Sequence, residues 1–286
     1  MKIEVIEPKG YCAGVVRAIK IALCAKKDNP DKDIYILGML VHNNETIKML
    51  EDKGITILKD NDKEKAINSI KDGSILIFTA HGHSEKLDKI AKAKNLAVYD
   101  ATCMVVSANL KLAKEKLNDG YKIIFVGKHN HPETEAILSL SDDILLVEEN
   151  KPINYYFSTN DKIFVINQTT LNYDNLLNIH NEIHSHYPNA IIQNEVCSTT
   201  RLRQQKLRNI DKDVDLVIVV GSSISNNTIE LYEIAKSIKE NVILVESVND
   251  LKEDFIKNKN HIVVVSGAST PSETVDMIVD KINSIK

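Results

Sequence analysis

Three cysteines, Cys12, Cys103 and Cys197, divide the 286-residue chain into thirds of nearly equal length. Each follows a short apolar run that is typical of a strand, and each precedes an apolar periodicity that is typical of a helix. A thiol at the amino end of a helix is favoured as the thiolate, the form that binds metals. The spacing therefore predicts three equivalent thiolate ligands, one in each third of the chain.

These three cysteines lie far apart in sequence and have no histidine-rich partner set. They fit an iron–sulfur cluster better than structural zinc, because a zinc site is closed by four ligands, some of them close together in sequence. A cubane held by three cysteines leaves one iron without a protein ligand, and an open metal position is typical of catalysis. The three cysteines therefore favour an iron–sulfur cluster with an open metal position. The fourth thiol, Cys24, lies on a predicted apolar helix and is expected to be a small core residue.

Polar side chains follow the predicted strands at similar distances from each cysteine. They are His42 and His81 in the first third, His131, Glu133 and Thr169 in the second, and Ser225, Asn227 and Ser269 in the last. Sheets of α/β proteins place ligand contacts at the carboxyl ends of their strands. These residues are therefore candidates for one common site.

The segment 127–135, Gly-Lys-His-Asn-His-Pro-Glu-Thr-Glu, holds the densest group of titratable side chains in the chain. His131 and Glu133 flank a proline that rigidifies the turn, so they can form a proton-transfer pair. Pro-Glu-Thr-Glu is also how an ordinary helix begins, and both interpretations can hold because a helix amino end is an anion site as well. The second turn of this third, residues 167–170, carries only neutral hydrogen-bonding groups.

Two turns of the last third, residues 221–228 and 266–271, are rich in Ser, Asn and Thr. Exposed N–H groups, hydroxyls and amides at a helix amino end suit an oxyanion. One such turn is more often a plain capped turn, whereas two in the same third favour a phosphate site.

Other histidines carry weaker signals. His42 taken alone is more often a surface or core histidine than a ligand, and only its place in the repeat favours a functional role. His180, His184 and His186 have the i, i+4 spacing of a zinc pair but lack the accompanying glutamate signature, so we expect them on the surface. No role is assigned to His83.

The recurring pattern indicates a three-fold internal repeat of an α/β unit. The predicted fold class is α/β, with three pseudo-three-fold-related units that have small, mostly parallel sheets around a central iron–sulfur site. The predicted units are residues 14–102, 103–196 and 197–286, with residues 1–13 packing on the third.

Composition and charge argue against several classes of protein. A chain that is 43% hydrophobic can bury a substantial core. The net charge of −4 and the lack of a basic block argue against a nucleic-acid partner. We expect no membrane segment and no signal segment, because apolar runs are short and the chain opens on a strand. A cytoplasmic location follows, in which the thiols stay reduced.

The chain resembles the LytB/IspH-type family of 4-hydroxy-3-methylbut-2-enyl diphosphate reductases over its whole length. The resemblance is carried by an ordered set of motifs: Gly-Tyr-Cys-Ala-Gly-Val, Val-His-Asn, Ala-His-Gly, Asp-Ala-Thr-Cys, Gly-Lys-x-x-His-Pro-Glu, Gln-Thr-Thr-Leu, Cys-x-x-Thr-x-x-Arg-Gln and Gly-Ala-Ser-Thr-Pro. As an ordered set these motifs are highly specific.

This resemblance implies a [4Fe–4S] cluster on Cys12, Cys103 and Cys197 whose free iron takes the allylic hydroxyl of the substrate. It implies that Thr169 orients the hydroxyl and that Glu133, with His131 beside it, delivers protons. The implied diphosphate ligands are His42, His81, His131, Ser225, Asn226, Asn227 and Ser269. The implied products are isopentenyl and dimethylallyl diphosphate, formed with two electrons from a small ferredoxin or flavodoxin.

Some positions depart from the family pattern. Met104 stands where proline is usual, Ile224 where asparagine is usual, and Asn226 where serine is usual. Ser198 and Thr199 replace the customary Asn-Ala. Two other functions stay open: a cluster-dependent hydro-lyase without net electron transfer, and a non-catalytic iron–sulfur sensor or scaffold.

Overall fold

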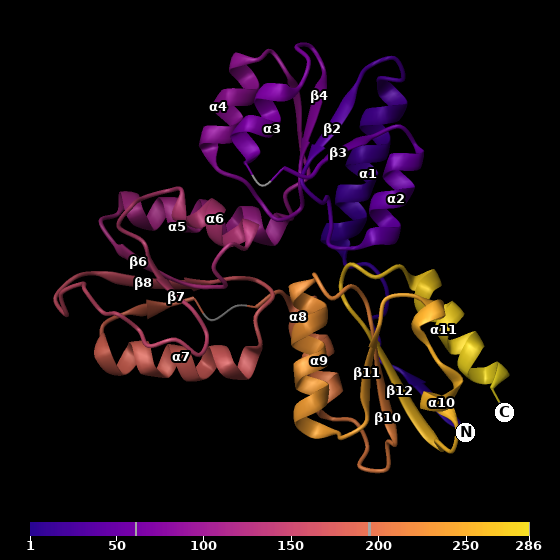
Figure 1. Ribbon diagram of the computed structural model, residues 1–286. Coiled ribbons are helices and arrows are strands. Elements are labelled where there is room, and N and C mark those ends of the chain that lie inside the picture. The colour runs from indigo at the N-terminus through magenta and orange to yellow at the C-terminus, as the bar shows by residue number, and fades with distance from the viewer. Residues whose placement is uncertain (61, 194–195, 286) are drawn as a thin grey trace. The chain divides into compact units, whose positions relative to one another are not determined.

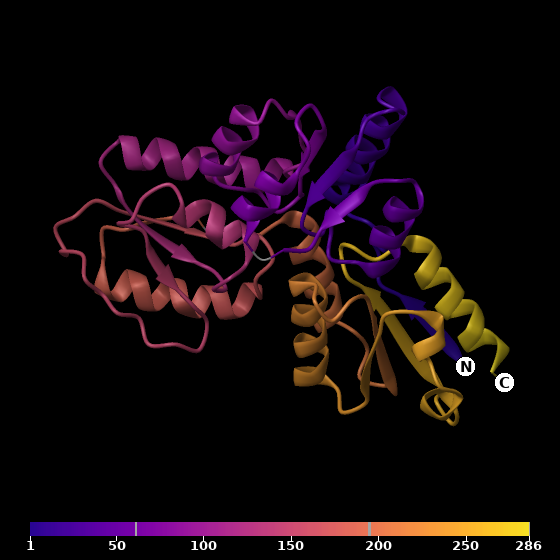
Figure 2. The ribbon, with the colours of Figure 1, turned by 45° about the horizontal axis from the view of Figure 1, so that its top comes forward.

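The computed structural model describes residues 1–60, 62–193 and 196–285, in which helices and strands alternate along most of the chain (Figures 1 and 2). Three small sheets are present, and every pairing among the described strands is parallel. The predicted α/β class with three small parallel sheets is confirmed.

The first sheet has the strand order β3-β2-β4-β5. Its strands are β2 (Ile34–Leu37), β3 (Thr56–Leu58), β4 (Ile75–Phe78) and β5 (Ala97–Asp100). The helices of this region are α1 (Ala13–Asp28), α2 (Asn44–Asp52), α3 (Lys63–Ser69) and α4 (Glu85–Ala93). Apolar residues of α3 and α4 pack on one face of the sheet.

The second sheet has the order β7-β6-β8-β9. Its strands are β6 (Lys122–Val126), β7 (Leu145–Val147), β8 (Ile163–Asn167) and β9 (Ile191–Ile192). Helices α5 (Met104–Asn118) and α6 (Pro132–Leu138) cover one face, and α7 (Tyr173–His186) covers the other, as Figure 1 shows.

The third sheet has the order β1-β12-β10-β11. Its strands are β1 (Lys2–Val5), β10 (Leu216–Val220), β11 (Val242–Val245) and β12 (His261–Ser266). Around it lie α8 (Ser198–Arg208), α9 (Asn226–Ile238), the 3₁₀ turn η1 (Val248–Asp250), α10 (Glu253–Ile256) and α11 (Ser272–Ser284). Helices α8 and α9 cover one face, and α10 and α11 the other (Figures 1 and 2).

All three sheets follow one plan. The first strand of each third lies inside its sheet, the second strand is on one side of it, and the third is on the other. The outer strand next to that third strand leads to a cysteine: β5 to Cys103, β9 to Cys197, and β1 to Cys12. The first strand of the chain therefore completes the sheet of the last third by pairing with β12.

Burial on both faces explains the apolar strands. All five residues of β10 are buried. Alternate side chains point to opposite faces, so Val217 and Val219 pack against α8 and α9, whereas Leu216 and Ile218 pack on the side of α10 and α11. A parallel sheet covered on both sides needs such continuous apolar runs.

The chain divides into two compact units. Unit 1 comprises Met1–Val16, His42–Thr46 and Cys197–Lys286, and unit 2 comprises Arg17–Val41 and Ile47–Val196. The limits of the three predicted units at residues 102 and 196 stay a prediction. None of the described helices is long and apolar enough to cross a membrane.

Two expectations about single helical residues are wrong. Cys24 is exposed, because the buried stripe of α1 runs through Ala18, Ala22 and Ala25 and leaves Cys24 beside it. His180 is only 4% exposed, because it follows Leu176 on the buried stripe of α7. His184 and His186 are exposed, as expected.

Candidate active site

Unit 1 holds two of the three candidate metal ligands, each at the amino end of a helix. Cys12 immediately precedes α1, and its carbonyl accepts a hydrogen bond from the Val16 amide at 3.0 Å. Cys197 is the N-cap of α8, and its carbonyl accepts from the Arg201 amide at 2.9 Å. The Cys197 thiol makes no capping hydrogen bond, which leaves the sulfur available as a ligand.

A buried cation lies near both of these thiols. Arg203 on α8 is 0% exposed and donates to the carbonyls of Ser266 at 2.7 Å and Gly10 at 2.6 Å. Burial lowers the pKa of Arg203, and negative charge on Cys12 and Cys197 opposes that shift. The guanidinium therefore provides positive charge where thiolates would form.

The two polar turns of unit 1 are joined through Asn227 on α9. Its amide nitrogen donates to Thr200 Oγ1 at 3.1 Å, and its amide oxygen accepts from the Ala268 amide at 2.9 Å. The amide of Cys12 in turn donates to the Ala268 carbonyl at 2.9 Å. Asn227 thus connects α8, the turn after β10 and the turn after β12, and it is 4% exposed.

Hydroxyl groups gather at the same turns. Ser225 is the N-cap residue of α9, and its hydroxyl makes no capping hydrogen bond. Ser269 Oγ lies 3.4 Å from Ser225 Oγ and donates to the His42 carbonyl at 3.0 Å. The described helix α9 therefore begins beside two buried hydroxyls, an arrangement that suits an oxyanion.

His42 belongs to unit 1 although it follows β2. The segment 42–46 is held there by a hydrogen bond from Thr274 Oγ1 to Glu45 at 2.7 Å and one from Asn44 to Glu246 at 2.8 Å. Burial lowers the pKa of His42. Structure thus brings together His42, Ser225, Asn227 and Ser269, four of the predicted ligands.

The departures from the family pattern lie at the surface. The Ile224 side chain is 52% exposed and that of Met104 is 71% exposed. Asn226, the first residue of α9, is partly buried beside the hydroxyl groups. The side-chain amide of Asn226 therefore lies next to Ser225 and Asn227, as expected for a further predicted diphosphate ligand.

Unit 2 holds the third thiol. Cys103 is the N-cap of α5, its thiol makes no capping hydrogen bond, and its amide donates to the Ala80 carbonyl at 2.9 Å. Ala80 directly precedes His81, so the strand end of β4 and the start of α5 are tied together. Cys103, like Cys12 and Cys197, is partly buried, and none of the cysteines forms a disulfide.

A carboxyl group is buried in unit 2. Glu133 on α6 is 2% exposed, and its oxygens accept hydrogen bonds from Thr169 Oγ1 at 3.0 Å and from the Thr169 amide at 3.1 and 3.2 Å. Burial raises the pKa of Glu133 to about 7, although hydrogen bonds from Thr169 and Asn109 act in the opposite direction. A carboxyl group with this pKa can release and regain a proton near neutral pH.

Two predicted histidines lie beside this carboxyl group. His131 is the N-cap of α6, and its Nδ1 accepts from the Glu133 amide at 3.2 Å. The rings of His81 and His131 meet edge to face with centroids 6.0 Å apart. His131, Glu133 and Thr169, the three predicted catalytic residues, therefore lie together with His81 in unit 2.

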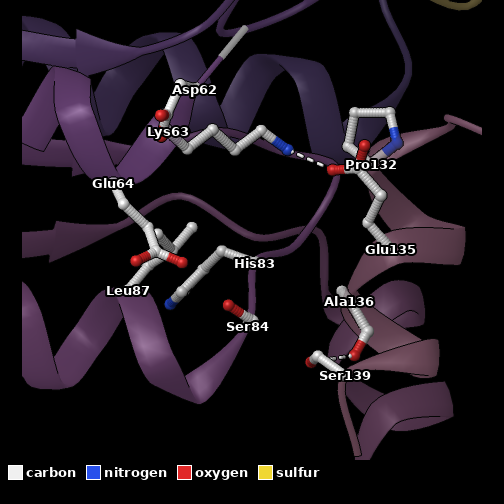
Figure 3. Close-up of a pocket in the computed structure, with 10 residues that line it drawn as sticks. All are labelled: Asp62, Lys63, Glu64, His83, Ser84, Leu87, Pro132, Glu135, Ala136 and Ser139. Atoms are coloured by element: carbon white, nitrogen blue, oxygen red, sulfur yellow. Dashed lines mark hydrogen bonds and ion pairs between the residues drawn. The ribbon is translucent and has the colours of Figure 1, made fainter. Parts of the chain in front are cut away.

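A small cavity of about 250 Å³ lies next to this region in unit 2 (Figure 3). His83 lines it, stacks on Phe78 with ring centroids 3.6 Å apart, and places Nε2 3.0 Å from Asp88. Across the cavity, Lys63 pairs with Glu135 of α6. The His83 ring thus packs against the end of β4, and its Nε2 pairs with the Asp88 carboxylate.

Two residues near the site were not predicted from the sequence. Asn109 on α5 donates to the Asn167 carbonyl at 3.2 Å and hydrogen bonds to Glu133. Arg203 has the contacts described above. The Arg-Gln of the motif Cys-x-x-Thr-x-x-Arg-Gln was the signal for Arg203, whereas Asn109 lies in no motif and only its tertiary contact reveals it.

The donor set fits an iron–sulfur cluster. Three thiols without disulfide partners stand at three helix amino ends, where the helix dipoles favour negative charge. Among the described residues, the Nε of Arg203 has no hydrogen-bond partner although it is buried. A cluster with thiolate ligands is anionic, so a buried guanidinium beside two of them matches its charge.

Comparisons with known proteins show the family of the chain. The family model described as LytB protein matches residues 3–283. A 4-hydroxy-3-methylbut-2-enyl diphosphate reductase of Lysinibacillus sphaericus (strain C3-41) is 36% identical over 282 residues, which cover 98% of this chain and 87% of the relative. The enzyme of the same name from Malacoplasma penetrans (strain HF-2) is 36% identical over 287 residues, 98% of this chain and 96% of the relative.

Solved structures show the same fold. The E-1-hydroxy-2-methyl-but-2-enyl-4-diphosphate reductase from Plasmodium falciparum superposes with a TM-score of 0.91 at 32% identity, covering 98% of this chain and 87% of that one. A structure of (E)-4-hydroxy-3-methyl-but-2-enyl diphosphate reductase, described as the terminal enzyme of the non-mevalonate pathway, has a TM-score of 0.71 at 26% identity and full coverage of both chains.

Proposed function

Because the chain belongs to the LytB protein family, we propose that it is a reductase of the non-mevalonate pathway acting on 4-hydroxy-3-methylbut-2-enyl diphosphate. The reaction removes the allylic hydroxyl as water, consumes two electrons and two protons, and yields isopentenyl and dimethylallyl diphosphate. The observation that carries this proposal is Glu133, a buried carboxyl group with a pKa near neutrality beside the Thr169 hydroxyl.

Cys12, Cys103 and Cys197 are the proposed ligands of one [4Fe–4S] cluster. When bound, such a cluster supplies the electrons and an iron without a protein ligand that acts as a Lewis acid toward the leaving oxygen. Arg203 supports this assignment, because it keeps a buried positive charge near Cys12 and Cys197.

Glu133 is the proposed proton donor. Below its pKa of about 7 the carboxyl group carries a proton, and Thr169 Oγ1 lies 3.0 Å from it. The Thr169 hydroxyl can therefore bind the substrate hydroxyl and keep it in line with the acid. His131, whose Nδ1 accepts from the Glu133 amide, fixes the start of the helix that presents the acid.

The diphosphate is assigned to neutral donors. Ser225, Asn226, Asn227 and Ser269 provide hydroxyls and amides at the start of α9, where the helix dipole favours an anion. His42, His81 and His131 are the proposed histidine ligands of the same group. Binding of the diphosphate needs no cluster of Lys or Arg side chains, because oriented dipoles and hydrogen bonds can stabilise an anion by themselves.

An anaerobic assay tests the proposal. Cluster-reconstituted protein is reduced chemically and mixed with 4-hydroxy-3-methylbut-2-enyl diphosphate, and oxidation of the reductant is followed together with product formation. We expect oxidation that depends on substrate and releases both isoprenoid diphosphates. A small ferredoxin or flavodoxin should replace the chemical reductant.

Two other outcomes would contradict the reductase. Conversion of the substrate without reductant consumption would indicate a cluster-dependent hydro-lyase. An intact cluster with neither turnover nor diphosphate binding would indicate a sensor or scaffold, and the altered turn at Ile224 and Asn226 would then be the first place to examine.

A further inference from the structure

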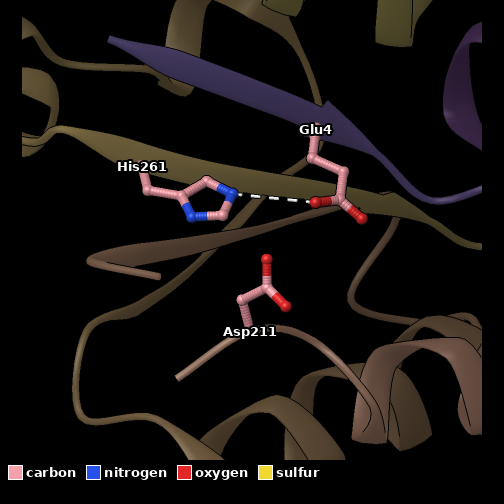
Figure 4. Close-up of side chains that lie close together, drawn as sticks. All are labelled: Glu4, Asp211 and His261. Carbon is pink, nitrogen blue, oxygen red and sulfur yellow. Dashed lines mark ion pairs between the residues drawn. The ribbon is translucent and has the colours of Figure 1, made fainter. Parts of the chain in front are cut away.

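Three side chains of types that can bind a metal lie together in unit 1, at the end of the sheet where strand β12 begins. The strand end that leads to Cys12 is the opposite one. The three side chains are Glu4 on β1, Asp211 in the loop after α8, and His261, the first residue of β12 (Figure 4). One ligand atom from each lies within 4.8 Å of the other two. In the parallel pairing Glu4 lies opposite Val263, two residues beyond His261, so Glu4 and His261 share one face of the sheet.

His261 is the unusual member of this group. Its side chain is buried, with 3% of the residue exposed, and neither ring nitrogen has a hydrogen-bond partner within the described chain. Nε2 lies 3.7 Å from Glu4, and Nδ1 lies 3.3 Å from Asp213. A buried polar group normally finds a partner, because leaving it unpaired destabilises the folded chain. An imidazole surrounded by carboxylates in this way is a metal-ligand arrangement.

The backbone around these side chains is held in place. Asp215 accepts hydrogen bonds from the amides of Asn260 at 2.6 Å and His261 at 3.0 Å, which fixes the start of β12. Lys239 donates to the carbonyls of Asp211 at 3.0 Å and Lys212 at 2.8 Å, which fixes the loop. The ligand-bearing backbone therefore needs no rearrangement to receive an ion.

We propose that Glu4, Asp211 and His261 form a binding site for a divalent transition-metal cation such as Zn²⁺. One imidazole with carboxylates suits zinc, whereas calcium and magnesium take oxygen ligands alone. Ligand atoms of a tetrahedral zinc ion lie about 3.4 Å apart, as follows from bonds of about 2.0–2.1 Å. The Glu4 and Asp211 side chains are 46% and 63% exposed, so they can rotate inward by the small amount required.

Lys2 competes for this site. Its ammonium group lies 3.8 Å from Glu4 and 3.4 Å from Asp211, where it neutralises the same carboxylates. A metal ion has to displace this ammonium group. Removal of Lys2 should therefore strengthen metal binding, which a purely structural ion-pair cluster would not predict.

A bound ion would link β1, β12 and the loop that follows α8. Cys12 follows β1 and Cys197 begins α8. The site would thus tie β1, which leads to Cys12, to the loop at the end of α8, the helix that Cys197 caps.

Zinc binding to the full chain tests the proposal. The cluster is reconstituted first in a Cys24→Ser background, so that no cysteine is left to bind zinc. Zn²⁺ uptake is then measured by equilibrium dialysis, and its ligands by X-ray absorption at the zinc edge. We expect one zinc ion per chain with nitrogen and oxygen ligands only. His261→Gln and Asp211→Asn should each weaken binding at least about tenfold, and Lys2→Gln should tighten it several-fold.

Asp254→Asn is the matched control, because it removes an exposed carboxylate elsewhere in unit 1 and should leave zinc affinity unchanged. Asp211→Asn changes an exposed side chain, so it stays informative even if His261→Gln fails to fold. Equal zinc affinity in wild type and Asp211→Asn, sulfur in the zinc coordination shell, or no zinc uptake would each overturn the proposal.

Discussion

Unit 1 and unit 2 present different chemistry at the ends of similar parallel sheets. Around Asn227, unit 1 offers hydroxyls and amides, and its histidine His42 has a pKa lowered by burial. Unit 2 instead buries Glu133, whose pKa burial raises to about 7. One architecture therefore gathers neutral hydroxyls and amides in one unit and places a titratable acid in the other. The comparison predicts that changes in unit 1 alter substrate binding or cluster retention, and that changes in unit 2 alter turnover.

The largest expected effect is on turnover. Glu133→Gln preserves the shape of the side chain but removes the proton, so kcat should fall by about 10²–10⁴ while iron content stays normal. Steady-state kinetics measures kcat, and iron analysis measures the iron content per chain. Glu135→Gln, an exposed change on the same helix, is the control and should keep nearly full activity. Near-normal turnover of Glu133→Gln would show that Glu133 is not the proton donor.

Arg203→Gln should be the most damaging change in unit 1. It breaks two hydrogen bonds from a buried charge to the carbonyls of Ser266 and Gly10. Since hydrogen bonds of charged groups contribute about 1.5–3 kcal/mol each, the free energy of unfolding should fall by about 3 kcal/mol or more. Urea unfolding and iron per chain are the measurements. Lys206→Gln on the exposed side of α8 should change neither, and full iron content in Arg203→Gln would contradict the role of its charge.

The pH dependence of turnover follows from Glu133. Because its pKa is raised to about 7 and the protonated form is the active one, kcat should be constant below that pH and fall above it. The expected slope is about tenfold per pH unit. A pH profile under saturating substrate measures it. A rate that rises through neutrality would mean that the ionised carboxylate is required.

Ser269→Ala should separate binding from chemistry. Its hydroxyl lies 3.4 Å from Ser225 Oγ among the proposed diphosphate ligands. Loss of one hydrogen bond of about 1 kcal/mol should raise KM roughly fivefold and leave kcat within about twofold. Ser223→Ala, an exposed change in the turn that holds Ser225, is the control. A fall in kcat at unchanged KM would move Ser269 to the reacting end of the substrate.

The smallest expected effect concerns Asn109. Its hydrogen bond lowers the pKa of Glu133, so Asn109→Ala should move the alkaline limb of the rate profile upward by up to about one pH unit. Ser107→Ala on an exposed part of α5 should leave the limb in place. An unchanged alkaline limb in Asn109→Ala would show that the hydrogen bond from Asn109 does not affect the pKa of Glu133.

The sequence predicted those features that local patterns determine. Apolar runs located the strands, and cysteines directly before helical patterns located the three helix starts. The buried faces of single helices were harder, because burial depends on which stripe meets the sheet. Leu176, His180 and Ile183 follow a buried-stripe spacing that would have placed His180 inside. Cys24 lies beside the alanine stripe of α1, so the apolar character of that helix misled the prediction.

Site residues were predictable where a turn follows a strand. Thr169 stands just past the end of β8, Glu133 stands at the start of α6 after the turn that follows β6, and the structure joins them by hydrogen bonds. Asn109 and Arg203 lie inside helices, and their roles come from contacts with residues distant in sequence. A local pattern carries no information about such contacts, because they form only when the helices dock on their sheets.

The pairing of β1 with β12 has a consequence for synthesis. Residues 2–5 are synthesised long before residues 261–266, their strand partner. Much of unit 2 can fold before β12 is made, whereas the sheet of unit 1 has to wait for that strand. Cys12 is therefore synthesised long before its sheet exists, and a centre that needs this thiol in its folded position has to wait for β12.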